Sequence, residues 1–199
     1  MPLLVATHNA GKLREFRQLL APLELVSALE LVPDLKVEET GQTFAENALL
    51  KARAFAQASG LIALADDSGL EVDALGGDPG VLSARYGGRD LDDEGRCRLL
   101  LRNLQPFAEP ARRSARFHCC LVAWAPDGRH CQADGACEGL IAPAPAGEGG
   151  FGYDPLFFVP EHQQTMAQLP PQLKNQLSHR GRALRALHPL LLQTFPELG

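Results

Sequence analysis

The sequence contains no apolar stretch that approaches the roughly 18 residues needed for a membrane-spanning helix. No signal peptide opens the chain either. These two absences argue against a membrane protein and against secretion. We therefore expect a soluble, cytoplasmic protein with no membrane partner.

Positive charge is scarce. The formal net charge is −5 at pH 7, whereas a duplex-binding protein needs a basic face, so we expect no nucleic-acid partner. Among the 19 basic residues, four are lysines, namely Lys12, Lys36, Lys51 and Lys174. A lysine in an arginine-rich chain suggests a need for a compact ammonium group, which suits single phosphate oxygens. Chance is the alternative explanation.

Cysteine occurs in an odd number, five, which argues against the disulfide framework of a small secreted protein. The Cys-x-x-Cys spacing of structural zinc sites is also missing. A zinc site remains an alternative, and its candidate ligands are His118, Cys119, Cys120, His130, Cys131 and Cys137. We predict core thiols instead, because free cysteine is among the most buried residue types.

The organisation of the chain indicates one domain. Its 199 residues, 45% of them hydrophobic, suffice for one large domain or a compact two-lobed one. No repeat, low-complexity tail or linker divides the chain, so we predict a single domain over residues 1–199. Strand-like and helix-like segments alternate in the first half, and two long strand-like segments flank a Pro-Asp-Gly turn at 126–128. This pattern predicts that the second half forms antiparallel sheet.

The most informative stretch is Leu61–Gly69, in which five apolar residues lead directly into Asp66, Asp67, Ser68 and a glycine. A short apolar run is typical of a buried strand, and ligands of open α/β sheets bind at the carboxyl ends of strands. We therefore expect a strand that ends at the two carboxylates, which point to opposite sides of the extended backbone. Beyond them, residues 70–75 are expected to continue as extended chain up to the glycine pair at 76–77. The alternative is an ordinary turn, because Asp, Ser and Gly all favour turns.

A second candidate site lies near the start of the chain. A short strand over Leu3–Thr7 precedes a loop at residues 8–11, and Lys12 begins an amphipathic helix. This arrangement predicts a phosphate site, since backbone amides and the helix dipole attract an anion and lysine adds charge. The glycine spacing is not that of a Walker A motif, and similar units without a ligand are common.

The segment between these two sites predicts a helix over residues 43–59. Thr43 and Glu46 form a capping box at its start, and a glycine follows its end. Glu39 lies in the loop before this helix, and Lys51 lies beside its apolar face. Such a crossover brings Glu39 and Lys51 toward Asp67. The alternative is that the loop glutamate is simply solvated, as most surface glutamates are.

The last third of the chain carries a glycine-rich loop at residues 146–155 and a helix from 178 to about 195. The loop holds Phe151 and Tyr153, and exposed rings there would suit stacking against a base. A rigid turn is the alternative reason for so many glycines. The helix places His179 and Arg180 in its first turn.

Five ordered motifs resemble those of the inosine/xanthosine triphosphate pyrophosphatase family, which acts on non-canonical purine nucleoside triphosphates. The motifs are Thr7-His8-Asn9-Ala10-Gly11-Lys12, the segment from Glu38 to Ala48, Asp66-Asp67-Ser68-Gly69, Phe151-Gly152-Tyr153-Asp154-Pro155 and Ser178-His179-Arg180-Gly181. They span nearly the whole chain. The departures are His8, where the family often has a small residue, and Gln172-Leu173 before Lys174, where acidic residues are common.

The resemblance implies a two-lobed α/β fold with a long central mixed sheet flanked by helices, and an active-site cleft between the lobes. It also implies a homodimer that uses Mg²⁺ to hydrolyse inosine, deoxyinosine and xanthosine triphosphates to nucleoside monophosphate and pyrophosphate. By the same resemblance, Glu39 and Asp67 are the metal carboxylates and Asp67 is the proton acceptor. The implied substrate-binding residues are Thr7, His8, Asn9, Ala10, Gly11, Lys12 and Lys51 for the phosphates, then Ser68, Phe151, Gly152, Tyr153, Asp154, Lys174, His179 and Arg180, the last of these chiefly around the base.

The residue types suit this chemistry. Magnesium prefers oxygen ligands, typically one or two carboxylates with phosphate oxygens and waters. No serine, cysteine or histidine is set up as a covalent nucleophile, so we expect direct attack by water. Two alternatives are a nucleotide-binding module without turnover and a nucleic-acid binder that uses the Phe151 loop. The acidic charge disfavours the second.

Overall fold

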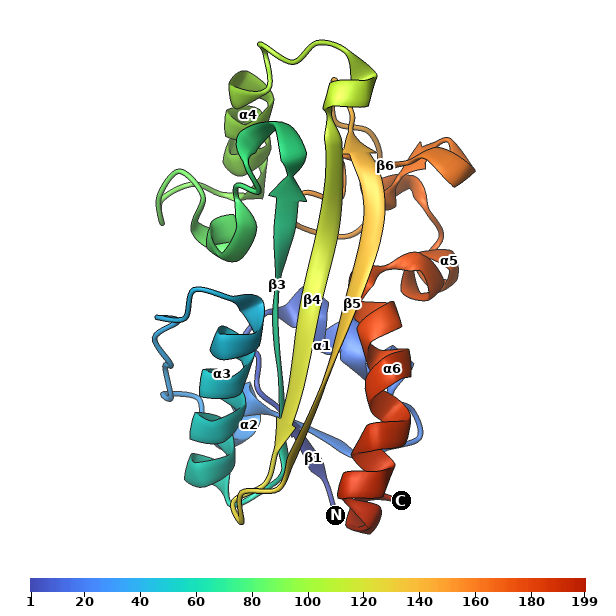
Figure 1. Cartoon of the computed structure of the whole chain (residues 1–199). Helices are drawn as coiled ribbons and strands as arrows, with labels where there is room; N and C mark the ends of the chain where they lie inside the picture. Colours follow the sequence, from blue (N-terminus) through green and yellow to red (C-terminus); the bar gives the residue numbers. More distant parts are fainter. The chain divides into compact units, whose positions relative to one another are not determined.

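The computed structural model describes residues 1–199 and has an α/β architecture (Figure 1). Seven strands form one sheet in the order β2-β1-β3-β4-β5-β6-β7. The strands are β1 (Leu3–Val5), β2 (Leu25–Ser27), β3 (Ala63–Val72), β4 (Ser114–Trp124), β5 (His130–Ile141), β6 (Phe157–Val159) and β7 (Gln164–Thr165). The helices are α1 (Ala10–Leu19), α2 (Ala28–Leu31), α3 (Phe44–Ser59), α4 (Asp93–Asn103), α5 (Pro171–Leu177) and α6 (His179–Thr194).

The sheet is mixed. Strand β1 pairs in parallel with both β2 and β3, and all of its residues are buried, as expected for a parallel strand covered on both faces. Strand β6 pairs antiparallel with β5 and with β7. Strands β4 and β5 are neighbours joined by a tight turn, in which the Ala125 amide donates to the Arg129 carbonyl at 2.9 Å. The predicted α/β fold is therefore confirmed.

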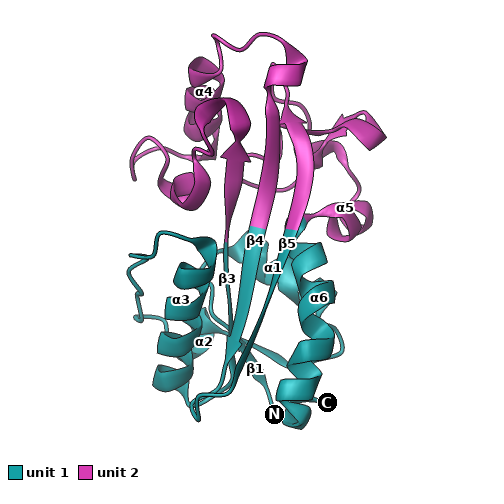
Figure 2. Cartoon of the chain, in the orientation of Figure 1, with its two compact units in different colours: residues 1–67, 119–135, 179–199 teal, residues 68–118, 136–178 magenta.

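The chain folds into two compact units (Figure 2). Unit 1 contains residues 1–67, 119–135 and 179–199, and unit 2 contains residues 68–118 and 136–178. The chain therefore passes four times from one unit to the other. Each unit has an apolar core of its own.

The core of unit 1 follows the alternation of side chains along its strands. Leu3, Val5, Ile62 and Leu64 are alternate residues of neighbouring strands, and they belong to one core cluster with apolar side chains of α1 and α6. Helix α3 lies on the opposite face of these strands (Figure 1). Within unit 1, residues of β3 with the parity of Leu64 therefore face α1 and α6, whereas the others face α3.

Unit 2 has a core rich in aromatic and leucine side chains. Phe117 of β4 and Phe157 of β6 have ring centroids 4.5 Å apart. Leu70 and Val72 from the end of β3 are fully buried in the same cluster, together with Leu100 of α4. Strand β3 therefore contributes side chains to both cores.

The prediction that this strand ends at the two carboxylates is wrong. Strand β3 has ten residues, and Asp66 and Asp67 lie in its middle. The physical reason is the apolar sequence beyond them: Leu70 and Val72 are both fully buried in the core of unit 2. The strand therefore continues through Ser68 instead of turning there.

Other elements differ from the prediction at their ends. Helix α1 begins at Ala10, two residues before the predicted start at Lys12, because Asn9 supplies the cap. Helix α2 was not predicted, although Ser27 and Glu30 form a capping box. Helix α5 was not predicted either, since its seven residues show no long apolar period. Helix α6 begins and ends within one residue of the predicted bounds.

The cysteines occupy core positions. All five are free, and Cys97, Cys119, Cys120 and Cys137 are buried. Burial raises the pKa of the Cys97 thiol to about 11 and that of Cys120 to about 12, so both stay protonated at neutral pH. The prediction of core thiols is confirmed for these four. No helix has both the length and the apolar character required to span a membrane.

Candidate active site

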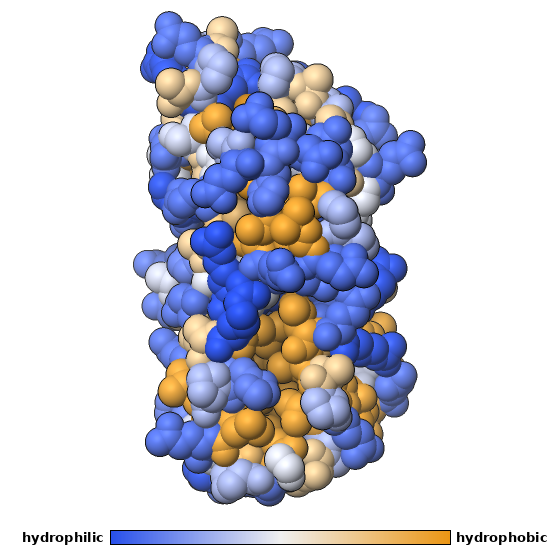
Figure 3. All heavy atoms as spheres, turned by 90° about the vertical axis from the view of Figure 1, so that its right-hand side faces the viewer, coloured by the Kyte–Doolittle hydropathy of each residue, from blue (hydrophilic) through white to orange (hydrophobic).

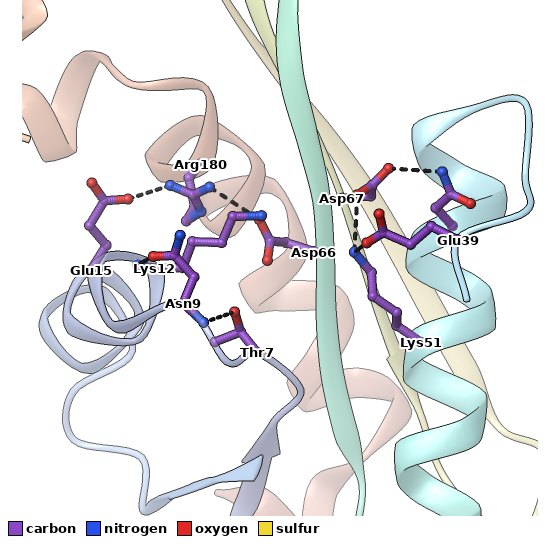
Figure 4. A network of polar contacts seen from close by, with 10 residues as sticks. Thr7, Asn9, Lys12, Glu15, Glu39, Lys51, Asp66, Asp67 and Arg180 are labelled. Atoms are coloured by element: carbon purple, nitrogen blue, oxygen red, sulfur yellow. Dashed lines mark hydrogen bonds and ion pairs between the residues drawn. The ribbon is translucent and has the colours of Figure 1, made fainter. Parts of the chain in front are cut away.

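Two carboxylates in the middle of β3 organise the polar residues of unit 1. Asp66 has the parity of Leu64 and points toward α1 and α6, whereas Asp67 points toward α3 (Figure 4). Their relative exposures are 2% and 6%. The expected divergence of the two side chains is confirmed, and each carboxylate has its own set of partners.

On the first face, Asp66 is surrounded by cations. Its Oδ2 atom lies 2.8 Å from the Lys12 ammonium and 3.1 Å from Nη2 of Arg180. The other terminal nitrogen of Arg180 donates to the carboxylate of Glu15. Burial by itself would raise the pKa of Asp66, but Lys12 and Arg180 outweigh that effect and hold it far below the usual range. Asp66 is therefore an anion at neutral pH.

On the second face, Asp67 divides its two oxygens between two residues of α3. Lys51 donates to Oδ1 at 3.0 Å, and the Asn47 amide donates to Oδ2 at 3.2 Å. The same ammonium donates to Oε1 of Glu39 at 2.6 Å. The predicted approach of Glu39 and Lys51 to Asp67 is thus confirmed.

The pKa of Asp67 moves in the opposite direction from that of Asp66. Burial is the main cause and raises the pKa of Asp67, the nearby Lys51 lowers it, and the Glu39 carboxylate raises it again, with a net increase. For Lys51, burial lowers the pKa, but Asp67, Asp66 and Glu39 together leave it raised. Neighbouring groups whose pKa values are pushed apart are typical of acid–base sites. Asp67 is the better proton acceptor of the two.

Helix α3 directs Asn47 and Lys51 toward Asp67 because of where the helix begins and because of its 3.6-residue period. Thr43 and Glu46 form the predicted capping box, with the Glu46 amide donating to Thr43 Oγ1 at 3.2 Å. Asn47 and Lys51 are four residues apart and therefore lie on the same face of the helix, toward β3.

The two carboxylates Glu39 and Asp67 form the part of the site that suits a metal ion. Oε1 of Glu39 and Oδ1 of Asp67 both approach one cationic group, the Lys51 ammonium. Two carboxylates directed at one point, with oxygen as the only ligand atom, fit Mg²⁺, which takes its remaining ligands from waters and substrate phosphates.

The predicted phosphate loop has the geometry of a helix N-terminus. Thr7 Oγ1 accepts from the Asn9 amide at 3.1 Å, and Asn9 Oδ1 accepts from the Lys12 amide at 3.0 Å. The amide of Ala10, the first residue of α1, has no acceptor within the helix by position, so the start of α1 is suited to an anion. His8 fits beside α3, where its ring centroid lies 5.9 Å from that of Phe55.

The glycine-rich loop of unit 2 is organised by Asp154. Its Oδ2 atom accepts from the Phe151 amide at 2.9 Å and from the Lys174 ammonium at 2.7 Å. The same ammonium lies 5.1 Å from the centroid of the Phe151 ring. At Gly150, φ is +77° and a Cβ atom would lie 2.0 Å from Asp154 Oδ2, so only glycine allows this turn.

The two aromatic residues of this loop differ. Phe151 is half-buried, which leaves part of its ring available. Tyr153 is 5% exposed, belongs to the core of unit 2 and donates its hydroxyl to the Ser83 carbonyl at 3.0 Å. The prediction of an exposed aromatic ring is therefore wrong for Tyr153, because the tight turn directs that ring inward.

The remaining predicted residues lie on two elements. Ser68 is half-buried in β3. His179 and Arg180 lie in the first turn of α6, as predicted, with 9% and 1% exposure. Sequence reasoning missed Glu15 and the bridging role of Asn47. The signal for Glu15 was its position three residues after Lys12, on the same helix face.

Comparison with known proteins gives consistent matches over nearly the full chain. The model of the Ham1 family matches residues 3–190. A dITP/XTP pyrophosphatase of Thermus thermophilus is 53% identical over 189 residues, which are 94% of this chain and 90% of that protein. One from Desulforamulus reducens is 49% identical over 193 residues, 96% of each chain. The structure of a HAM1 protein from Coxiella burnetii has a TM-score of 0.87 and 43% identity, covering 97% of this chain and 99% of that one.

Proposed function

The chain belongs to the Ham1 family, and from this premise we propose that it is a nucleoside triphosphate pyrophosphatase. It hydrolyses inosine, deoxyinosine and xanthosine triphosphates to nucleoside monophosphate and pyrophosphate, and so removes non-canonical purines from the nucleotide pool. The observation that carries this proposal is that the carboxylates of Glu39 and Asp67 converge on one position, which the Lys51 ammonium approaches. The pKa of Asp67, one of these two carboxylates, is raised.

Glu39 and Asp67 would hold the Mg²⁺ ion, and Asp67 accepts the proton of the attacking water. When bound, the ion neutralises phosphate charge and acts as a Lewis acid toward the phosphoryl oxygens. Burial supports the role of Asp67, because a raised pKa makes its carboxylate a stronger base than a solvated one. Asp66 is unsuited to that role, since Lys12 and Arg180 stabilise its charged form.

The phosphate contacts come from two places in unit 1. Residues 7–12 offer the α1 N-terminus and the Lys12 ammonium, and α3 offers Lys51. Lys12 and Lys51 lie on opposite sides of β3 (Figure 4), so they serve different phosphate groups of an extended triphosphate. Charge neutralisation and positioning are what a phosphoryl-transfer site mainly has to supply.

The remaining substrate-binding residues are assigned by the resemblance, the last of them chiefly around the base. They are Ser68, Phe151, Gly152, Tyr153, Asp154, Lys174, His179 and Arg180. Phe151 supplies a ring face for stacking, and Tyr153 and Asp154 hold the loop in shape. Lysine and arginine are donors only, so they favour the 6-keto oxygen of hypoxanthine and xanthine over the 6-amino group of adenine.

Residues 1–199 act as one catalytic domain in a cytoplasmic homodimer without nucleic-acid or membrane partners. Two observations support a single domain: the chain passes four times between the units, and the matched family segment covers both. The dimer follows from the resemblance. Apolar side chains are exposed in patches on the face shown in Figure 3, which is the side of α5 and α6 in Figure 1. Separately, Leu29, Leu31, Leu49 and Leu50 of α2 and α3 are 38–46% exposed.

A panel of nucleoside triphosphates with Mg²⁺ tests this function. We expect inosine triphosphate to yield monophosphate and pyrophosphate in equal amounts, with kcat/KM ~10⁴ above that for adenosine triphosphate, because donors aimed at the 6-position leave buried groups unpaired with adenine. Separate detection of phosphate and pyrophosphate identifies the products. Orthophosphate and diphosphate as first products would contradict the proposal. Binding without any product would indicate a nucleotide-binding module instead.

A further inference from the structure

Asn47 is fully buried, with 0% relative exposure, although its side chain is an amide. Both ends of that amide are used. Nδ2 donates to Asp67 Oδ2 at 3.2 Å, and Oδ1 accepts from the Gly41 amide at 2.8 Å. A buried polar group that is satisfied at both ends fixes the position of whatever it contacts.

The two groups that Asn47 contacts belong to the two carboxylate-bearing segments. Asp67 lies in β3, and Gly41 lies two residues after Glu39 in the loop that precedes α3. The loop approaches the helix closely there: a Cβ atom on Gly41 would lie 2.7 Å from Asn47 Oδ1 and 2.6 Å from Cβ of Glu46. Glycine at position 41 is therefore required for this contact.

We propose that Asn47 is a positioning residue for the metal carboxylates, which sets the separation of Glu39 from Asp67 through one amide. This inference rests on the proposed function, since it assigns the two carboxylates to a metal ion. The Asn47 side chain hydrogen-bonds to Oδ2 of Asp67 and to the Gly41 amide, two residues after Glu39. Oδ1 of Asp67 and Oε1 of Glu39 stay directed at the common position now approached by Lys51.

The uncharged Asn47 side chain connects the two carboxylate-bearing segments in a way that Lys51 cannot maintain during the reaction. In the present arrangement Lys51 joins them, at 2.6 Å and 3.0 Å. A metal ion at the same position would repel the ammonium, and the proposed function also requires Lys51 for a phosphate group. Asn47 has no charge, so the bridge that it forms persists in either case. Residues that orient metal ligands typically contribute 10–100-fold to metal affinity or activity.

The alternative role for Asn47 is purely structural, as a buried side chain that stabilises the start of α3. Metal binding separates the two roles. A structural residue would lower stability without changing metal affinity in the molecules that remain folded. A positioning residue would weaken metal binding even at a temperature where the variant is fully folded.

The test measures Mn²⁺ binding to the full chain by electron paramagnetic resonance, without nucleotide, in three variants. Asn47→Ala removes the bridge from the helix side, and Gly41→Ala disrupts it from the loop side. Leu191→Ala is the control, because this fully buried side chain belongs to the core of unit 1 and its loss affects stability alone. Hydrogen exchange at the Gly41 amide reports on the bridge directly.

We expect the Mn²⁺ dissociation constant to rise about 10-fold in Asn47→Ala and Gly41→Ala, with faster exchange at residue 41 in Asn47→Ala. The Leu191→Ala variant should bind Mn²⁺ like the wild type. Wild-type affinity in both bridge variants, an equal loss in the control or no Mn²⁺ binding by the wild type would overturn the inference. Should Asn47→Ala fail to fold, Gly41→Ala decides. Since no turnover is measured, failure of the proposed function appears separately, as absence of pyrophosphate release by the wild type.

Discussion

Replacement of Asp67 by asparagine is expected to lower kcat for inosine triphosphate by ~10² to 10⁴, the usual contribution of a general base. The substitution keeps the size of the side chain but removes the proton acceptor and one of the two metal carboxylates. It should lower the free energy of unfolding less than Asp66→Asn does, because burial raises the pKa of Asp67, whereas Lys12 and Arg180 hold that of Asp66 low. Steady-state kinetics and thermal unfolding of the same preparation check both parts.

Asp66→Asn is the matched control, since it makes the same chemical change one residue away. We expect it to lower the free energy of unfolding, because Lys12 and Arg180 lose a buried counter-ion. Because the pKa of Asp66 is lower in the folded than in the unfolded state, its charged form stabilises the protein at pH values above the unfolded pKa of about 3.9. This stabilisation is lost as the pH falls from the unfolded pKa through the folded pKa. The difference in stability between wild type and Asp66→Asn should therefore shrink below pH ~4. Similar losses of kcat without any difference in stability would show that Asp67 is not the base.

Arg180→Met is expected to destabilise the protein by about 3–5 kcal/mol, the usual cost of breaking a buried ion pair by removing one partner. The arginine is 1% exposed and contacts the carboxylates of Glu15 and Asp66. Methionine retains most of the side-chain volume, so the loss reports on charge rather than on packing. Urea unfolding at neutral pH measures it. Glu15→Gln is the control from the other end of the network and should cost less, since Asp66 keeps its pairs with Arg180 and Lys12.

The same variant also tests the base-binding role of Arg180. The resemblance places Arg180 among the residues around the base. At a temperature where Arg180→Met is folded, we expect kcat/KM for inosine triphosphate to fall more than that for adenosine triphosphate. An equal proportional loss would restrict Arg180 to its contacts with Asp66 and Glu15. A stability loss below ~1 kcal/mol, the level of an exposed ion pair, would contradict the buried network itself.

The parts of the site that could be predicted from the sequence are those fixed by local rules. The opposite directions of Asp66 and Asp67 follow from the alternation of a strand. The start of α3 follows from its capping box, and the position of Lys51 beside Asp67 follows from a strand directly after that helix. These features depend on neighbours in sequence, so one segment is enough to establish them.

The features that could not be predicted depend on distant residues or on core packing. Arg180 meets Glu15 across 165 positions of sequence, and nothing local indicates that pairing. Strand β3 continues past its carboxylates because its last residues enter a second core, which a strand-then-turn pattern conceals. The burial of Tyr153 depends on a tight turn at Gly150, where the Asp154 side chain accepts from the Phe151 amide and leaves no room for a Cβ atom on residue 150.

The central claim is that water attacks the α-phosphorus of a purine nucleoside triphosphate, with Asp67 as the proton acceptor and pyrophosphate as the leaving group. The most direct test is hydrolysis of inosine triphosphate in water labelled with heavy oxygen, followed by mass spectrometry of both products. We predict that the label enters only the nucleoside monophosphate. Label in the pyrophosphate would show attack at the β-phosphorus and contradict the account.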